Sequence, residues 1–340
     1  MNIIKLSCPA LFIFPVILSL ADENPQKSSP HLFDPNTMPS SCGAWIDVEA
    51  LYWQSNMGSL SYGVESNSTK VIKGKVNHLD FDWNWGVRLG LGYKVPHDRW
   101  DLLGTYTHLQ GNAHGHAGGS HHVVFPSWAT GFGRSDCCLY ADKAKASWRL
   151  NLNMADIELG RNCLASRWLS LRPFFGVRGL FINHEFSVRY RGGAVATSDV
   201  DVFQADSDFW GAGLRFGVDT LWGLGKGLGI YGNGSASLLS GHFDVHEKEK
   251  LKKSHSTQVN IKNDVDNMVA AADLALGLQW DYLFSNDRFH LGLKFGWEFN
   301  IFFDQNELFN FMSFNNPGAI NFTKDDLTFQ GLTVGVRFDF

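Results

Sequence analysis

The chain has 340 residues, of which 44% are hydrophobic and 14% aromatic, and it contains 35 glycines and 12 tryptophans. This composition is too apolar for a disordered protein, and the length suits one large domain or two small ones. Lys and Arg number 29 against 34 Asp and Glu, which gives a net charge of -5. This balance indicates no nucleic-acid-binding surface, so we expect no nucleic-acid partner.

The N-terminus has the pattern of a secretory signal peptide. Lys5 precedes an apolar stretch from 10 to 20, and a small-x-small cleavage site ends at Ala21. We therefore expect residues 1-21 to be a signal peptide and residues 22-43 to be an N-terminal periplasmic segment. No later run reaches the roughly 18 apolar residues that a transmembrane helix needs. The mature chain could cross a membrane only with strands.

Beyond residue 43, apolar residues alternate with small or charged ones, which is the period of a β-strand with two different faces. In residues 83 to 93, Trp, Trp, Val, Leu, Leu and Tyr hold one face, while Asn, Gly, Arg, Gly and Gly hold the other. The segments that follow this pattern and are predicted as strands are 44 to 53, 81 to 93, 99 to 110, 145 to 160, 167 to 190, 207 to 222, 226 to 243, 266 to 284, 287 to 303 and 327 to 340.

The two faces of these strands indicate an outer-membrane barrel rather than a soluble β-sandwich. The wet face of a sandwich is seldom so rich in glycine, whereas in a barrel the apolar residues face lipid and small and polar residues face the lumen. The barrel must close, because an open sheet edge in lipid leaves backbone groups unpaired at several kcal/mol each. We therefore predict an all-β fold, an antiparallel transmembrane β-barrel of about ten strands formed by residues 44-340.

The predicted connections alternate in length, with short periplasmic turns and long outward loops, as is usual in such barrels. This alternation places both ends of the barrel on the periplasmic side. The short links are 95 to 98, 161 to 167, 223 to 225 and 284 to 286, and the long ones are 54 to 80, 111 to 144, 191 to 206, 244 to 265 and 304 to 326.

One predicted strand, 145 to 160, breaks the pattern of its neighbours. Asp156 and Glu158 share the parity of the apolar residues before them and should not face lipid. A β-bulge near Ala155 would turn both carboxylates inward. The apolar residues that we expect to face lipid in this strand are Trp148, Leu150, Leu152 and Met154.

The last strand ends the chain on an aromatic residue, Phe340. A terminal aromatic residue on an alternating strand resembles the signal that the outer-membrane assembly machinery reads. The expected partners are therefore this machinery and the lipid of the outer membrane.

Several strand segments resemble one known family. They are Ala50-Leu51-Tyr52-Trp53, Trp83-Asn84-Trp85-Gly86-Val87-Arg88-Leu89-Gly90, Trp100-Asp101-Leu102, Asp156-Ile157-Glu158-Leu159-Gly160-Arg161 and Leu171-Arg172-Pro173-Phe174-Phe175-Gly176-Val177-Arg178-Gly179. In this order they resemble the Legionella-type major outer membrane protein family, which also occurs in chlamydia-like bacteria. The resemblance implies a pore-forming protein in the outer membrane of a Gram-negative bacterium. It specifies strand motifs rather than an activity, and the segment 111 to 144 matches no family pattern.

The polar strand faces carry the candidates for lining a lumen. A channel lined by arginines and carboxylates would set a transverse field on permeating solutes. The same charges could instead pair and plug the barrel, since a ten-stranded barrel has a narrow interior. The pattern leaves both alternatives open. The candidates are Asp47, Glu49, Arg88, Arg149, Arg172, Arg178, Arg189, Arg215, Asp219, Asp273, Lys294, Glu298, Arg337 and Asp339.

The segment 111 to 144 combines histidines with an adjacent pair of cysteines, Cys137 and Cys138. Imidazole and thiolate bind transition metals, but the spacing matches no defined zinc motif, and a solvated glycine-rich loop is the alternative. The two cysteines are candidates for disulfides that cross-link neighbouring barrels in a homo-oligomer, although free or loop-internal thiols are equally allowed. We expect no cofactor. The histidines are His114, His116, His121 and His122.

The sequence contains no established catalytic motif. His108 with Asp206 or Asp208 could imitate the Asp and His residues that outer-membrane proteases carry at their outer rim, but such pairs arise easily. We therefore expect no enzyme. The first hypothesis is a porin for passive diffusion of small hydrophilic solutes or ions, and the alternative is a structural or adhesive surface protein that uses the barrel as an anchor for its outward loops.

Overall fold

The computed structural model describes residues 43–95, 99–119, 122–130, 139–284, 289–311 and 320–340, so the expected signal peptide and nearly all of the periplasmic segment lie outside it. One large antiparallel sheet contains ten long strands. They are β1 (Ala44–Met57), β5 (Trp83–Lys94), β6 (Trp100–Gly118), β8 (Lys143–Arg161), β10 (Leu169–Gly192), β11 (Ala196–Gly225), β12 (Leu228–Leu251), β13 (Thr257–Phe284), β14 (Phe289–Phe302) and β17 (Leu327–Asp339).

The remaining strands are short. Two of them extend the large sheet: β4 (Asp80–Phe81) pairs with β6, and β9 (Cys163–Ser166) pairs with β10. The others form two small sheets from β2 (Gly63–Ser66), β3 (Gly74–Asn77) and β7 (Val123–Pro126), and from β15 (Phe309–Phe311) and β16 (Ile320–Phe322).

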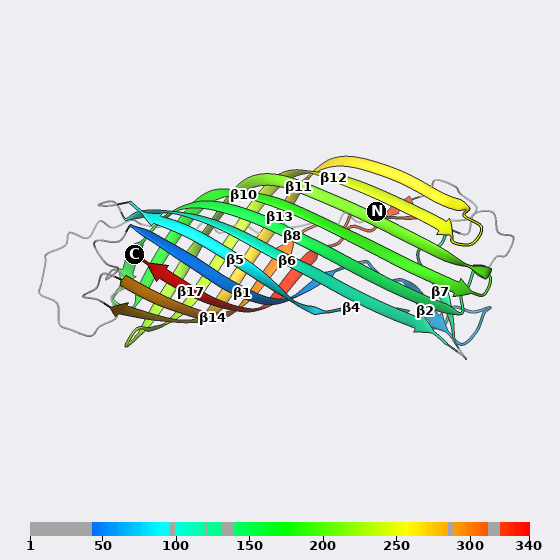
Figure 1. Cartoon of the computed structure of the whole chain (residues 1–340), viewed down its shortest axis with the longest axis horizontal. Coiled ribbons are helices and arrows are strands. Elements are labelled where there is room, and N and C mark those ends of the chain that lie inside the picture. Colours follow the sequence, from blue (N-terminus) through cyan, green and yellow to red (C-terminus); the bar gives the residue numbers. More distant parts are fainter. Residues whose placement is uncertain (1–42, 96–98, 120–121, 131–138, 285–288, 312–319) are drawn as a thin grey trace, which may run out of the picture. The chain divides into compact units, whose positions relative to one another are not determined.

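The ten long strands close into a barrel, which confirms the predicted fold class (Figure 1). Each strand pairs with its neighbours in the chain, and β1 pairs with β17 in an unbroken register from Trp45–Asp339 to Met57–Leu327. The Phe340 amide continues this ladder by donating to the Ala44 carbonyl at 3.0 Å. The barrel therefore begins and ends at one rim, and the short turns at that rim identify it as periplasmic.

A band of exposed apolar side chains surrounds the part of the barrel next to this rim. Trp85 is 72% exposed and Leu214 is 66% exposed, although both lie in regular strands of the sheet. Exposed aromatic residues border the band, with Trp222 toward the periplasmic rim and Trp83 and Trp210 at the opposite edge. Such a band with aromatic borders is the lipid-facing surface of an outer-membrane barrel.

Six strands continue far beyond the band. β6 and β8 have 19 residues each, and β10, β11, β12 and β13 have 24, 30, 24 and 28, whereas a membrane-spanning strand needs only about 10. We call this part of the sheet the outer extension (Figure 1). It corrects two predicted loops, 191 to 206 and 244 to 265, which are mostly strand and contain only tight turns at 193–195 and 252–256. The prediction was wrong because the alternation of these two segments was compared with that of strands embedded in lipid, which have an apolar outward face. Outside the membrane the outward face of a strand is polar.

The orientation of β8 corrects a second prediction. The strand pairs with β6 and β10 without any register shift, so no bulge lies near Ala155. Trp148 and Met154 are buried on the same inward face as Asp156 and Glu158. The expectation that Trp148, Leu150, Leu152 and Met154 face lipid is therefore wrong. These apolar residues point inward because the barrel interior is charged near one end of β8 and apolar near the other.

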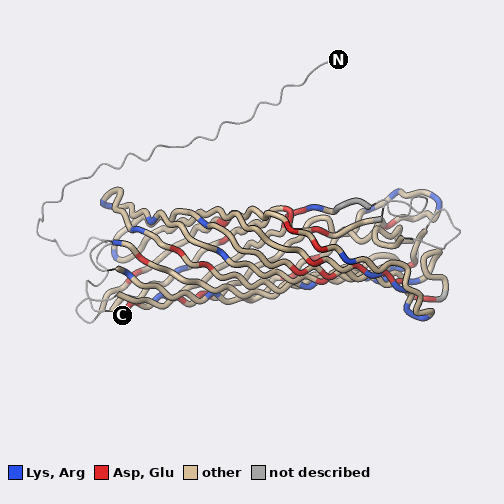
Figure 2. Tube along the Cα trace, turned by 90° about the horizontal axis from the view of Figure 1, so that it is seen from above, with Lys and Arg blue, Asp and Glu red and all other residues tan. Residues whose placement is uncertain are grey.

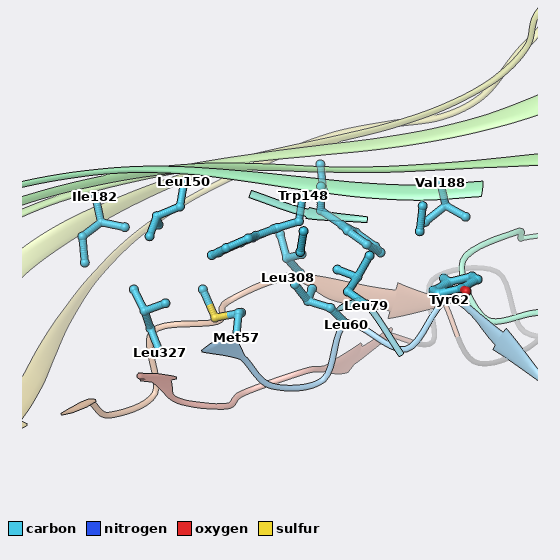
Figure 3. Close-up of a cluster of buried hydrophobic side chains, with 14 of the residues drawn as sticks. Met57, Leu60, Tyr62, Leu79, Trp148, Leu150, Ile182, Val188, Leu308 and Leu327 are labelled. Atoms are coloured by element: carbon cyan, nitrogen blue, oxygen red, sulfur yellow. The ribbon is translucent and has the colours of Figure 1, made fainter. Parts of the chain in front are cut away.

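The concave face of the outer extension is covered by apolar segments that fold into it. Met57 at the end of β1, Leu60 and Tyr62 just after it, and Leu308, which follows β14, pack against β8 and β10 (Figure 3). Trp148 and Phe186 are fully buried in this cluster. The interior therefore consists of an apolar part beneath the outer surface and a charged part at the level of the lipid-facing band.

Candidate functional site

The charged part of the interior surrounds a cavity of about 220 Å³. Side chains reach it from most of the ten strands because alternate residues of each strand point inward. The predicted lumen residues that line it are Asp47, Glu49, Arg88, Arg172, Arg178, Arg215, Asp219, Asp273, Lys294, Glu298 and Arg337. We use the name charged layer for these residues together with Asp101, Asp156 and Glu158, which also line the cavity.

Arg178 and Arg215 connect the carboxylates on one side of the charged layer. Arg178 Nε donates to Asp156 Oδ1 at 2.7 Å, and its Nη2 lies 2.8 Å from Asp273 Oδ2. Arg215 Nη2 lies 3.3 Å from the same Asp273 oxygen, and its Nη1 contacts Glu158. Two arginines and three carboxylates from four strands thus form one buried network.

Arg172 joins this network to the periplasmic half of the cavity. Its guanidinium donates to Asp101 Oδ1 at 2.5 Å, to Asp219 Oδ2 at 2.7 Å and to Glu158 Oε2 at 3.3 Å. The sequence analysis missed Asp101, although the parity of Asp101 with Leu103 and Thr105 places it on the inward face. A single carboxylate among apolar and small residues was too weak a pattern to predict a place in the lumen.

A second network lies across the cavity. Arg88 Nη1 donates to Glu49 Oε2 at 2.7 Å and its Nη2 donates to Glu298 Oε2 at 2.9 Å, so one cation holds together three strands. Nearer the periplasmic rim, Arg337 Nη2 lies 2.7 Å from Asp339 Oδ1, which is buried as the sequence predicts. Arginines inside the barrel thus pair with carboxylates instead of leaving a continuous row of free charge.

Inward glycines leave space that aromatic side chains fill. The Trp45 ring occupies the position where a Cβ on Gly92 would stand. The Tyr231 ring lies against both Gly277 and Gly296 in the same way. These glycines make room for large rings inside the barrel and so do not widen the lumen.

The apolar layer closes the interior on its outer side. It consists of the buried cluster around Trp148, Phe186, Phe243 and Leu308. A cation–π contact of 5.4 Å between the Arg88 guanidinium and the Trp53 ring joins it to the charged layer. A solute that crosses the barrel would meet both layers.

Buried carboxylates of β12 hold the covering segments in place. Glu247 Oε1 accepts a hydrogen bond from the Phe309 amide at 2.6 Å, and Glu249 Oε2 accepts one from the Thr130 hydroxyl at 2.5 Å. Both lie in the outer extension, beyond the lipid-facing band. Burial raises the pKa of Glu247 to about 8. Burial, reinforced by the neighbouring Asp201 carboxylate, raises the pKa of Glu249 to about 7.

His184 is buried in the same layer. Neither of its ring nitrogens has a hydrogen-bond partner among the described residues. Burial lowers the pKa of His184 to about 4, so the ring is neutral at physiological pH. It behaves as a packed aromatic residue near Trp148, 6.4 Å between ring centroids.

Two predicted lumen residues lie on the outside. Arg149 pairs with Glu185 at 2.6 Å on the outer surface, where its side chain is 68% exposed. Arg189 is also exposed on the outward face of β10. Both expectations are wrong because they assume that polar residues face the lumen and apolar residues face lipid. In the outer extension the apolar face of a strand packs in the apolar layer, and the polar face meets water.

The predicted metal and thiol candidates do not form a site in the described part of the chain. His114 and His122 lie near Asp82 and Glu65, at 4.0 and 3.9 Å, and no group of three metal-binding side chains is found among the described residues. His116 is exposed. His121, Cys137 and Cys138 lie outside the described residues.

The histidine considered for catalysis has another partner. His108 Nδ1 lies 2.9 Å from Asn153 Oδ1 on the outer surface. Asp208 accepts a hydrogen bond from Asn183 at 2.6 Å, and the strands β8 and β10 separate His108 from β11, which carries Asp206 and Asp208. The described residues thus do not bring this pair together.

The sequence matches one family model over residues 37–340, that of the Legionella pneumophila major outer membrane protein precursor. The chain belongs to this family. The family assignment and the closed barrel locate it in the outer membrane. Among the described residues, no helix has the length and hydrophobicity needed to span a bilayer.

Solved outer-membrane barrels share little sequence with the chain. The outer membrane protease OmpT from Escherichia coli is 11% identical, with a TM-score of 0.48, 88% of this chain and 97% of that chain being covered. The Pseudomonas putida toluene transporter TodX is also 11% identical, with a TM-score of 0.32 and coverage of 87% and 89%. No protein of curated function matches the chain in sequence.

Proposed function

We propose that this chain is a structural surface protein of the outer membrane, whose closed barrel anchors the outer extension. The observation that carries the proposal is the double closure of the interior. Paired arginines and carboxylates surround the cavity at the level of the lipid-facing band, and the apolar layer covers them from outside. The proposal assigns no catalytic step to any residue.

The energetics of the two layers support a closed resting state. Removing one partner from a buried ion pair costs about 3–5 kcal/mol, because the other charge is left uncompensated. Opening a path through the charged layer would break several such pairs, among them Arg178–Asp156 and Arg88–Glu298. Opening the apolar layer would expose large buried side chains such as Trp148 and Phe186 to water.

Single-channel conductance of the folded protein in a planar bilayer tests this proposal. We expect no sustained conductance from the wild type or from Leu308→Asp alone, and conductance steps only when Leu308→Asp in the apolar layer is combined with Arg88→Ala in the charged layer. The matched control is Val71→Asp, because Val71 is 58% exposed outside that layer. Sustained steps from the wild type would contradict the proposal.

The polar cavity supports a second candidate, a porin for small hydrophilic solutes or ions. Its walls carry both signs of charge, which suits passage of hydrated ions once the apolar layer moves aside. Wild-type conductance whose ion selectivity changes in Arg88→Ala and Arg215→Ala would establish this function. If the barrel is closed, the same two variants should show no conductance.

A further inference from the structure

The end of the outer extension carries cations that face one another across neighbouring strands. Lys145 of β8 is directly opposite Arg189 of β10, and Lys143 is opposite Arg191. All four side chains are exposed on the outward face, because the alternating residues of both strands, such as Ala144 and Tyr190, are buried in the apolar layer. Like charges directly opposite each other destabilise a sheet, so folding does not account for this arrangement.

Two more cations extend the group across β11. Lys248 and Lys250 of β12 face outward opposite Gln204 and Val202. They lie so close together that a hydrogen bond and charge repulsion from Lys248 lower the pKa of Lys250. We use the name distal cation patch for Lys143, Lys145, Arg189, Arg191, Lys248 and Lys250.

Carboxylates do not neutralise the distal cation patch. None of its six members forms an ion pair with a carboxylate among the described residues. The two nearest turns do contain aspartates, but Asp142 accepts a hydrogen bond from the Gly193 amide and Asp199 accepts one from the Lys253 amide. The cations are therefore available to a ligand.

Carboxylates outnumber cations on the outward face between the lipid-facing band and the patch. Glu185, Asp206, Asp208 and Asp244 lie there with Arg149 and Lys262, which pair with Glu185 and Asp244, and the patch lies toward the far end (Figure 2). On β11, Val202 lies eight residues beyond the lipid-facing Trp210, about 26 Å along a strand. Lipid phosphates at the membrane surface would thus meet the carboxylates first, whereas the patch faces away from the cell.

We propose that the distal cation patch binds a linear sulfated polysaccharide outside the cell. This inference rests on the proposed role as a surface protein and names the class of its partner. A sheet spaces cations by about 4.8 Å between strands and about 6.8 Å along a strand, which suits the repeated anionic groups of an extended chain. Arginine forks bind sulfate oxygens in pairs, and lysines add point charges.

Heparin binding to the full-length protein in lipid nanodiscs tests the proposal. The test variant is Lys145→Gln/Arg189→Gln/Arg191→Gln, and the matched control is Lys70→Gln/Lys73→Gln/Lys75→Gln, which removes the same charge from exposed lysines of the segment 66–75. We expect the Kd for heparin to rise about tenfold in the test variant, because three exposed charge contacts with sulfate groups are lost. We expect a change below about twofold in the control.

Further probes decide between ligand classes. Binding should weaken at higher salt and should be lost with desulfated heparin. The proposal is overturned if wild type does not bind heparin, if both triple variants lose affinity equally, or if purified lipopolysaccharide or duplex DNA binds the patch as tightly as heparin does. Heparin binding and conductance are measured independently. If the protein does not bind heparin, the closed-barrel proposal is unaffected. If the wild type conducts, the proposal for the distal cation patch is unaffected.

Discussion

Arg178 and Asp156 form a buried ion pair between directly opposite residues of β10 and β8, with Nε and Oδ1 2.7 Å apart. Seven residue positions away on the same two strands, Arg149 and Glu185 form a similar pair that is exposed to water. One pair of strands thus contains the same chemical interaction inside and outside the barrel. The comparison separates the effect of burial from the effect of the pair itself.

We predict that Arg178→Ala lowers the free energy of unfolding by about 3–5 kcal/mol, because the buried Asp156 and Asp273 each lose their shortest ion pair and keep only the longer contacts to Arg215. Arg149→Ala should change it by less than about 1 kcal/mol, since an exposed pair gains little. Urea unfolding in detergent micelles measures both. An equal decrease in the free energy of unfolding for the two variants would show that water screens the charges of the charged layer as it does at the surface.

Trp148 tests the apolar layer. Trp148→Ala should cost about 3–5 kcal/mol, because the indole is fully buried and its removal leaves a cavity. The control is Trp210→Ala, since Trp210 is 57% exposed to lipid. Protection of β8 and β10 amides from hydrogen exchange reports on the outer extension. If the control loses as much protection as Trp148→Ala, the apolar layer does not stabilise the extension.

Gly92 tests whether glycine makes room for an aromatic ring. We expect Gly92→Ala to destabilise the barrel by about 1–3 kcal/mol, because the new methyl group overlaps the Trp45 indole. Gly179→Ala should be far milder, since the nearest atom to its Cβ would be 3.9 Å away. The double variant Gly92→Ala/Trp45→Ala should lose less than the sum of its single variants. Additive losses in thermal unfolding would contradict the contact.

Much of the barrel could be predicted from sequence because lipid imposes a strict alternation. The parity that places Leu89 and Leu91 in lipid also places Arg88 in the lumen, and the same rule found eleven of the fifteen charged residues that line the cavity. The pairing of those charges could not be predicted, since Arg88 meets Glu298 only after the barrel closes. Strand periodicity specifies which face a residue takes but not its partner around the ring.

The outer extension could not be predicted because its strands bury their apolar face inside and expose their polar face outside, the reverse of the strands in lipid. Trp148 and Arg149 look like a lipid-facing and a lumen-facing residue, yet the first is buried inside and the second is exposed outside. Alternation alone does not say which face meets lipid, water or a packed core. The position of a residue relative to the membrane decides this, and segments such as 57–62 that supply the core lie far away in the sequence.

The raised pKa values of Glu247 and Glu249 predict that the outer extension loses stability as the pH rises. Between the ordinary value of 4.5 and about 8, folded Glu247 keeps a proton that the unfolded chain releases. The contribution is therefore complete below pH 4.5 and is lost on the way to pH 8, by an amount on the order of a few kcal/mol. Protease resistance of the extension at pH 5 and pH 9 measures the effect.

Neutral variants identify the groups responsible for this pH dependence. Glu247→Gln keeps an acceptor for the Phe309 amide and should reduce the loss of protease resistance at pH 9. Glu247→Gln/Glu249→Gln should remove most of it, because the pKa of Glu249 is also raised, to about 7. Glu185→Gln, at an exposed pair, should leave the pH profile unchanged. A profile that is flat in the wild type, or equally steep in the double variant, would show that the two buried carboxylates do not hold the covering segments through their protonated forms.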